Sequence, residues 1–542
     1  MFARVFWHLS YKRRVGNTSK EYAASSWSLN TLLASEMDNK IEPSASTVGV
    51  PSPAVPSLDV DEAHRYLQEH AHAGSAGYDM ARVMRKVDWR LTPLLFFSYF
   101  FQALDKQALS YAAVMGMPKD LNLKGDDFSN AATALFVALL VTQVPTAYAL
   151  NKLPAAKWLA FTSVLWGIAT ALTATAHNYR WLMAARILMG VFEAAVLPSV
   201  TMICSQYYRK DKSGFRFTLW GAAIGSSFVI GALLSYGFQH IHHAALASWR
   251  ILFLVLGCVS TVFGLALFWL LPDTPMKARY LTDAEKVAIL QYVAANKTGV
   301  RCSSFKFAQL VEIIRDPQIW MSTILTTVVM LSTGFTLSYT APVIAGFGFP
   351  APYAALLVAP GGVVTLLSSW LAGYLLNTGM PRAVVVAALY VPVVVGASLL
   401  AFAPVTNRAA SLTGIYLVSC STAAYCVMYQ WASANVAGRT KRTAIMGLIT
   451  AGFAAGALIA PQTFRDQEAP HFMSAKITLF ATQLASVILA GLWGAYYCLV
   501  NRHRNSRYGS ATLLRHDEAA SMQAEVWENI TDRERKSFRY VP

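Results

Sequence analysis

Four charged side chains lie in stretches of this 542-residue sequence that are otherwise apolar enough to cross a lipid bilayer. Asp105 and Lys106 are neighbours within Thr92–Met117, and Arg186 and Glu193 stand seven residues apart in a later stretch. A charge near the bilayer centre costs at least about 2.5 kcal/mol, so such residues usually face a bundle interior or a water-filled cavity. We therefore predict that these four side chains line a polar route through a membrane protein.

The depth of the charges in the bilayer distinguishes a polar route from the simpler alternative, in which the charges lie near the membrane surface. About thirteen residues of this stretch precede Asp105, which corresponds to roughly 20 Å of helix. The alternative is that Asp105, Lys106 or Arg186 lies shallow and reaches the headgroups. Glu193 is deeper than Arg186 and lies on nearly the same helix face, so it must either pair with a cation or take up a proton. Buried cations suit an anionic substrate, and the two carboxylates suit proton coupling.

The second half of the chain offers neutral polar groups in place of charges. Of these we select Tyr339 and Gln430 as candidates that contact a substrate from the other side, although most such groups make helix-to-helix hydrogen bonds. The full set within its apolar stretches is Tyr339, Tyr390, Tyr425, Tyr429, Gln430, Asn435 and Gln462.

Composition places the chain among polytopic membrane proteins. Hydrophobic residues make up 55% and charged residues 14%, against about 25% charged residues in soluble domains. The net charge of +16 is spread beside the apolar stretches, which argues against a nucleic-acid partner and for contact with lipid. We expect a monomer.

Twelve apolar stretches are long enough to span a bilayer as helices, which predicts an all-α membrane protein. They divide the chain into a disordered tail (1–88), a six-helix bundle (89–271), a central loop (272–316), a second six-helix bundle (317–500) and a C-terminal tail (501–542). The stretches are Thr92–Ala113, Asn130–Leu150, Trp158–Ala176, Tyr179–Tyr207, Phe217–Phe238, Trp249–Leu271, Gln318–Phe347, Tyr353–Asn377, Arg382–Pro404, Ala409–Ala432, Thr443–Thr463 and Ile477–Val500.

Lysine and arginine favour one side of the predicted membrane by about three to one, so both termini and the central loop are expected in the cytoplasm. Within that loop, Thr282 and Glu285 have the spacing of a capping box at the start of an amphipathic helix. Met37 is a second possible start of the protein.

The sequence contains little that would support catalysis or a bound metal. It has no nucleophile elbow and no HExxH motif, so we do not expect an enzyme. His240, His242 and His243 cluster after the fifth stretch, but one short histidine tract supplies no complete ligand set, and a solvated loop is the simpler interpretation. We therefore expect no metal or cofactor. If the polar route carries a solute together with protons, the proton gradient would be its driving force.

Six stretches, a loop and six more suggest two pseudo-symmetric halves. A short sequence similarity between the halves supports duplication: Tyr148–Asn151 reads YALN and Tyr374–Asn377 reads YLLN.

From about Asp61 onward, the chain resembles the anion:cation symporter family of the major facilitator superfamily, and within it the fungal allantoate-permease-like group. The segments that resemble the signatures of this group are LDKQALSYAAVMGM, RILMGVFEAAVLPS, SWRILFLVLG, LPDTPMKARYLTDAEK, ANVAGRTKR, APQTFRDQEAP and ITDRERKSFRYVP.

The resemblance implies uptake at the plasma membrane of a small organic anion, such as allantoate, nicotinate or pantothenate, together with a proton. By position, Asp105 and Glu193 would handle protons, while Lys106 and Arg186 would hold the substrate carboxylate. Lys106 stands where many relatives have arginine, and lysine is a point charge without the planar fork of arginine. Efflux of a secondary metabolite and nutrient sensing without transport are the alternatives.

Overall fold

A computed structural model describes residues 66, 79–208, 214–241, 245–294, 307–404, 407–437, 439–468, 472–508, 531–534 and 538–541. The chain divides into two units, Met1–Leu58 and Asp59–Pro542, and all of the described residues belong to the second. Met37, His242, His243 and most of the two predicted tails lie outside the described residues.

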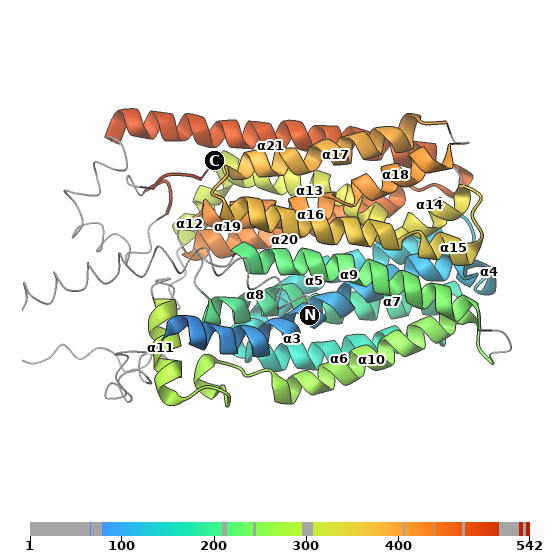
Figure 1. Cartoon of the computed structure of the whole chain (residues 1–542), viewed down its shortest axis with the longest axis horizontal. Coiled ribbons are helices and arrows are strands. Elements are labelled where there is room, and N and C mark those ends of the chain that lie inside the picture. Colours follow the sequence, from blue (N-terminus) through green and yellow to red (C-terminus); the bar gives the residue numbers. More distant parts are fainter. Residues whose placement is uncertain are drawn as a thin grey trace, which may run out of the picture. The chain divides into compact units, whose positions relative to one another are not determined.

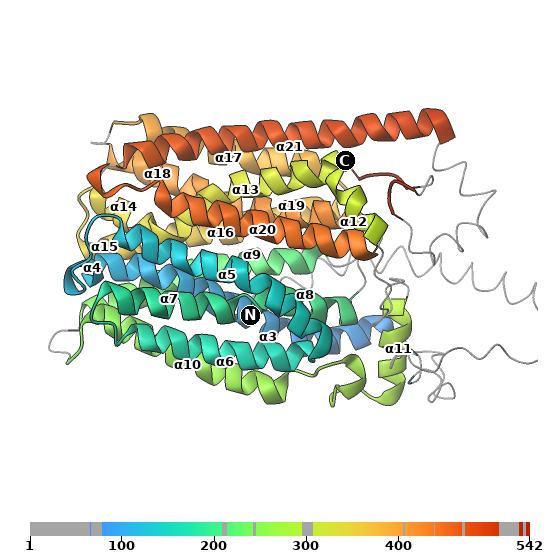
Figure 2. The ribbon, with the colours of Figure 1, turned by 180° about the vertical axis from the view of Figure 1, so that it is seen from behind.

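The described residues form helices and contain no strand, which confirms the predicted fold class. The helices run alongside one another, with the first half blue to green and the second yellow to red (Figures 1 and 2). The first half contains α3 (Met80–Val114), α4 (Met117–Asp120), α5 (Asp127–Lys152), α6 (Ala155–Thr173), α7 (Tyr179–Glu193), α8 (Val196–Tyr207), α9 (Gly214–Gln239) and α10 (Ser248–Leu270).

A connecting segment and the second half complete the unit. The connection contains η2 (Pro275–Lys277), α11 (Asp283–Ala294) and α12 (Phe307–Ile314). The second half contains α13 (Pro317–Ser338), α14 (Thr340–Gly346), α15 (Ala351–Leu356), α16 (Ala359–Asn377), α17 (Arg382–Phe402), α18 (Arg408–Val418), α19 (Ser421–Ala434), α20 (Arg439–Gln462), η3 (Asp466–Glu468) and α21 (Met473–Tyr508). We call the end where α3 begins and α21 ends the terminal end, and the opposite end the loop end.

Eleven helical segments of the described chain are long and apolar enough to cross a membrane, where the sequence predicted twelve. The difference is α3, which has 35 residues but is interrupted at its centre by Gln102, Asp105, Lys106 and Gln107. The side chains that make α3 a functional candidate are therefore the ones that lower its apolar character. α3 also begins at Met80, so residues 80–88 of the predicted tail are helical.

Three of the predicted spans break four residues before a proline. α7 gives way to α8 at Ala194 ahead of Pro198, α13 ends at Ser338 ahead of Pro342, and α15 ends at Leu356 ahead of Pro360. A proline has no N–H to donate to the carbonyl of the residue four positions earlier, and its ring crowds that carbonyl. The break between α18 and α19 has no such proline. The sequence thus places a break directly after Glu193.

Glycines allow close approach between particular helices. Across the two halves, a Cβ on Gly225 of α9 would lie 2.7 Å from the Gly362 carbonyl oxygen of α16, and a Cβ on Gly362 would lie 2.6 Å from the Gly225 carbonyl oxygen. Within the second half, a Cβ on Gly456 of α20 would lie 2.3 Å from the Thr327 carbonyl oxygen of α13. Only glycine fits at these crossings, as in other membrane helix pairs.

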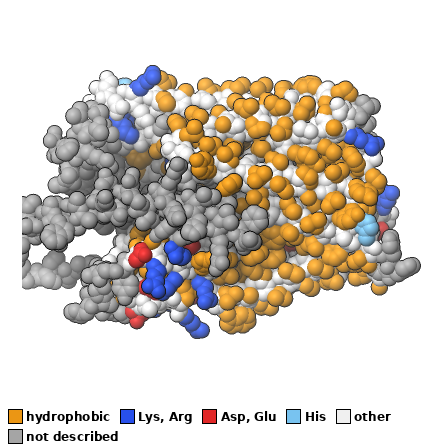
Figure 3. All heavy atoms as spheres, viewed as in Figure 1, with side chains coloured by type: hydrophobic (Ala, Val, Ile, Leu, Met, Phe, Trp, Pro, Cys, Tyr) orange, Lys and Arg blue, Asp and Glu red, His pale blue; other side chains and the backbone are white. Residues whose placement is uncertain are grey.

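The surface of the unit matches a lipid environment. Apolar side chains cover the middle of the face in Figure 3, and lysines and arginines lie toward its ends. Large apolar side chains stay exposed along the helices, among them Trp269, Val144 and Val141. Such a continuous apolar belt would be unusual on a soluble monomer, and it identifies the part of the surface that contacts lipid tails.

At the terminal end, the central segment is joined to the first half. The Thr282 backbone N–H donates to Glu285 and the Glu285 N–H donates to Thr282 Oγ1, so the predicted capping box is present. Glu285 also forms an ion pair with Lys86 of α3.

The end of the chain packs onto the second half. Lys441 of α20 is fully buried, and its Nζ lies 2.8 Å from Asp532 and 2.6 Å from Asp316. Burial lowers the pKa of Lys441, but the two carboxylates outweigh burial and raise it above its ordinary value. The Val541 carbonyl accepts hydrogen bonds from Trp431 and Asn435. The last residues of the predicted tail are therefore held in place by α19 and α20.

Candidate functional site

A cavity of about 110 Å³ lies between the two halves. The first half supplies residues from α3, α5, α7, α8 and α9, and the second supplies residues from α13, α19 and α20. The polar and aromatic lining comprises Tyr99, Gln102, Lys106, Gln143, Glu193 and Phe228 from the first half, and Thr336, Thr422, Tyr425, Tyr429, Thr450 and Phe453 from the second.

The charged part of the cavity wall is an ion pair between Lys106 and Glu193. The side chain of Lys106 is 9% exposed and that of Glu193 is 0% exposed, so water screens this pair weakly. Glu193 is the last residue of α7, directly before the break that Pro198 produces. The Ala194 carbonyl, which has lost its helical partner, accepts a hydrogen bond from Gln143 Nε2 at 3.5 Å.

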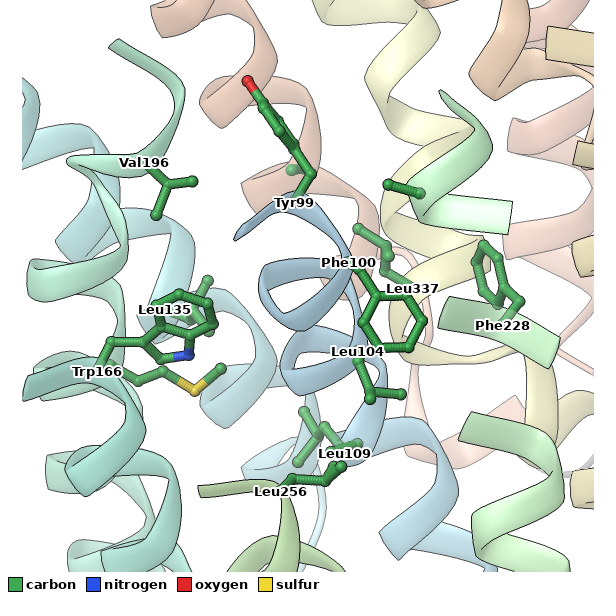
Figure 4. Close-up of a cluster of buried hydrophobic side chains, with 14 of the residues drawn as sticks. Tyr99, Phe100, Leu104, Leu109, Leu135, Trp166, Val196, Phe228, Leu256 and Leu337 are labelled. Carbon is green, nitrogen blue, oxygen red and sulfur yellow. The ribbon is translucent and has the colours of Figure 1, made fainter. Parts of the chain in front are cut away.

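Asp105 faces away from the cavity, although it is adjacent to Lys106. Successive side chains on an α-helix point about 100° apart, and Asp105 turns toward α6 and α10. One of its carboxylate oxygens, Oδ2, accepts hydrogen bonds from Trp166 Nε1 at 2.6 Å, Ser260 Oγ at 3.2 Å and Thr170 Oγ1 at 3.4 Å. The other oxygen, Oδ1, is buried and has no hydrogen-bond partner. In Figure 4, Trp166 and Phe228 come from helices on opposite sides of α3.

Arg186 is also buried inside the first half and is absent from the cavity lining. Its guanidinium lies 5.5 Å from the centre of the Phe253 ring, and its Nη1 donates to Met189 Sδ at 3.8 Å. Its Nε and Nη2 have no hydrogen-bond partner. Asp105 and Glu193 lie within its electrostatic range. The four predicted charged residues thus form one buried group of two acids and two bases, in which Lys106 and Glu193 reach the cavity.

Tyr339 and Gln430 are not among the residues that line the cavity. Tyr339 lies at the loop end, where its hydroxyl is 2.5 Å from Ser129 Oγ of α5 and its ring stacks on Phe464 at 3.9 Å between centroids. Gln430 is partly buried on α19, and its Oε1 has no hydrogen-bond partner. The structure does not bring these two residues together with the four charged ones.

Tyr339 belongs to a set of contacts that joins the halves at the loop end. Ser129 Oγ donates to the Phe464 carbonyl at 3.1 Å. Gln462 Nε2 donates to Thr133 Oγ1 at 2.8 Å, and the Ala341 N–H donates to Ser110 Oγ at 3.2 Å. These contacts close the loop end between the two halves.

Other residues of the site were not selected from the sequence, although Tyr425 and Tyr429 belong to its wider set of neutral polar groups. Thr422, Tyr425 and Tyr429 line the cavity from α19, and their spacing of three and four residues places them on one helix face. Trp166 and Thr170, one helical turn apart on α6, bind Asp105. The helical spacing was visible in the sequence, but which face of each helix points inward was not.

Comparison with known proteins identifies the architecture. The sequence pattern of the Major Facilitator Superfamily matches residues 95–461. The chain belongs to the major facilitator superfamily. It is 32% identical to a thiamine pathway transporter of Saccharomyces cerevisiae, over 85% of this chain and 86% of that protein. It is 27% identical to the allantoate permease of the same yeast, over 97% of this chain and 99% of the permease.

Further relatives agree with this assignment. An MFS-type transporter of Penicillium expansum is 28% identical over 85% of this chain and 88% of its own length. Among solved structures, a bacterial homologue of the human lysosomal transporter Spinster superposes with a TM-score of 0.52 at 15% identity, over 79% of this chain and 98% of the homologue. The protein is therefore a multi-pass membrane transporter of the fungal allantoate-permease-like group, not an enzyme.

Proposed function

We propose that this transporter moves a small organic anion together with protons, by alternating access between its two halves. The observation that carries the proposal is the ion pair between Lys106 and Glu193 on the cavity wall. Lys106 is the cation among the cavity-lining residues, and it already has an anionic partner in Glu193.

The ion pair provides a physical reason for coupling. An anion that enters the cavity gains most from Lys106, but Glu193 competes for the same ammonium group and repels a second negative charge. A proton on Glu193 removes both obstacles, so that anion binding and proton binding favour each other. In this scheme the buried charges change little during transport: Lys106 exchanges one carboxylate for another, and Glu193 becomes neutral.

Asp105 and Arg186 form the second part of the proposed coupling machinery. Asp105 Oδ1 and two guanidinium nitrogens of Arg186 lack hydrogen-bond partners, and such groups are costly to leave unsatisfied in a buried site. We infer that Asp105 accepts a proton in another state of the transport cycle, in which Arg186 turns toward Glu193 or the substrate. The loop-end contacts, including Ser129 with Tyr339 and Gln462 with Thr133, must break when that end opens.

The distribution of charge supports an orientation for the protein in its membrane. Arg82, Arg85, Lys86 and Arg90 lie on the first turns of α3 at the terminal end. An excess of lysine and arginine marks the cytoplasmic side, so we place both termini in the cytoplasm. We further propose that the substrate is taken up across the plasma membrane, as the resemblance to the allantoate-permease-like group implies.

Uptake measurements test the proposal. Cells expressing the protein should accumulate a radiolabelled monocarboxylate such as benzoate, and a protonophore should abolish the accumulation. Glu193→Gln should abolish concentrative uptake but retain exchange of labelled for unlabelled substrate, because a permanently neutral side chain still allows anion binding. Glu468→Gln, at the end of η3, makes the same chemical change away from the cavity and should behave as wild type, because an amide oxygen can still accept a hydrogen bond from Ser474. Accumulation that persists after the proton gradient has collapsed would exclude the coupling.

A further inference from the structure

We propose that the transported anion is a monocarboxylate built on a single flat, mostly apolar ring, that is, an aromatic or heteroaromatic monocarboxylate. The inference rests on the proposed role of Lys106 in holding the anion. It adds the class of substrate, which it derives from the charge, aromatic content, size and polarity of the cavity.

The charge of the cavity limits the substrate to one carboxylate. Among its described lining residues, Lys106 is the cation and Glu193 is the acid. One substrate carboxylate can take the place of Glu193 on Lys106. A second carboxylate would lie among apolar side chains without a cation, and burying an unpaired charge is strongly unfavourable.

The second half presents an aromatic wall to the cavity. Tyr425 and Tyr429 of α19 are 6.4 Å apart between ring centroids, and Tyr425 and Phe453 of α20 are 5.7 Å apart. Phe228 and Tyr99 contribute two more rings from the first half. Aromatic rings interact favourably with other rings at centroid distances of about 4.5–7 Å. A flat ring can therefore contact this wall while its carboxylate reaches Lys106 on the opposite half.

The size of the cavity favours one ring over two. Its volume is about 110 Å³, and an apolar cavity of about 150 Å³ is known to bind benzene. The cavity is smaller than one that holds benzene, so a single ring with one carboxylate already requires side chains to shift, and a fused or linked pair of rings would require far more room.

The aromatic wall opposite Lys106 suits an apolar ring better than a substrate with many hydrogen-bond donors. An acid with ureido groups, such as allantoate, is polar over most of its length, so placing it against aromatic and apolar side chains costs more than placing a flat apolar ring there. We therefore expect this transporter to discriminate against the substrate for which its relative, the allantoate permease, is named.

Equilibrium binding to the purified full-length protein, without any proton gradient, tests the substrate class. The ligands are benzoate, the non-planar cyclohexanecarboxylate, the dicarboxylate terephthalate and allantoate, measured by calorimetry at one pH. We expect benzoate to bind about 3- to 10-fold more tightly than cyclohexanecarboxylate and at least about tenfold more tightly than terephthalate or allantoate. Equal affinity for allantoate and benzoate would overturn the inference.

Variants of the aromatic wall provide the second measurement. Tyr429→Leu should weaken benzoate binding by about 3- to 10-fold and change acetate binding little, whereas Tyr429→Phe should restore benzoate affinity. Tyr374→Leu is a matched control, because Tyr374 is exposed on α16 and does not line the cavity. Unchanged benzoate affinity in Tyr429→Leu would contradict the inference even if ligand selectivity were as expected.

The same measurements separate this inference from the proposed function. Lys106→Gln should abolish benzoate binding; retained binding would reject the anion site on which both proposals depend. If benzoate binds as expected but protonophores do not affect its uptake, only the coupling fails. If uptake is proton-coupled but allantoate is preferred, only the substrate class fails.

Discussion

Replacing Trp166 with phenylalanine should move the pH dependence of uptake without abolishing transport. Trp166 Nε1 donates the shortest of the three hydrogen bonds to Asp105 Oδ2, at 2.6 Å, and the side chain is fully buried. Phenylalanine keeps an aromatic ring, although a smaller one, and removes the donor. The ionised form of Asp105 then loses a partner that its protonated form needs less, so Asp105 takes up a proton at higher pH than in wild type.

The size of the shift follows from the hydrogen bond that is lost. A hydrogen bond to a charged group contributes about 1.5–3 kcal/mol, and one pH unit of a titration midpoint corresponds to about 1.4 kcal/mol. If the proton on Asp105 is required for transport, the alkaline limb of the uptake profile should move upward by about one to two pH units. Initial uptake rates of labelled benzoate between pH 4 and pH 9, normalised to protein at the cell surface, measure this limb.

The control must separate a missing donor from a smaller side chain. Trp158→Phe makes the same substitution in the same helix, and Trp158 Nε1 has no hydrogen-bond partner. That variant should leave the midpoint in place. A structural effect at Trp166 would lower expression or maximal rate but leave the midpoint unchanged. An unshifted midpoint in a well-expressed Trp166→Phe protein would refute the assignment of a coupling proton to Asp105.

Two further predictions concern the packing that supports the site. Asp532→Asn removes a charge from the buried cluster around Lys441, where the two side chains are 2.8 Å apart; it should lower stability by about 1.5–3 kcal/mol, seen as a lower melting temperature in detergent. Gly225→Ala places a methyl group 2.7 Å from the Gly362 carbonyl oxygen, so α9 and α16 must separate and the transport rate should fall. Gly447→Ala has no heavy atom within 4 Å of the added methyl group and should leave transport unchanged; equal rates in all three proteins would contradict the close crossing.

The sequence alone was sufficient to predict the helical architecture, because a bilayer requires long apolar helices; the breaks ahead of Pro198, Pro342 and Pro360 became apparent only in the structure. The sequence also identified Asp105, Lys106, Arg186 and Glu193, since ionisable groups are costly in a membrane unless they are buried in protein or reach water. The capping box of Thr282 and Glu285 was predicted for a similar reason: its two hydrogen bonds join residues three positions apart, and local geometry determines them.

Only the tertiary structure decided how these side chains are paired. Lys106 binds Glu193 of α7, whereas its neighbour Asp105 binds Trp166 of α6, because adjacent positions on a helix face different partners. The tertiary structure also decided that Tyr339 lies at the loop end, beside Ser129, and that Lys441 and Asp532 meet although 91 positions separate them in the sequence. Spacing along one helix predicts which residues share a face, but the rotation and packing of separate helices depend on all of their contacts together. That packing determines which face lines the cavity.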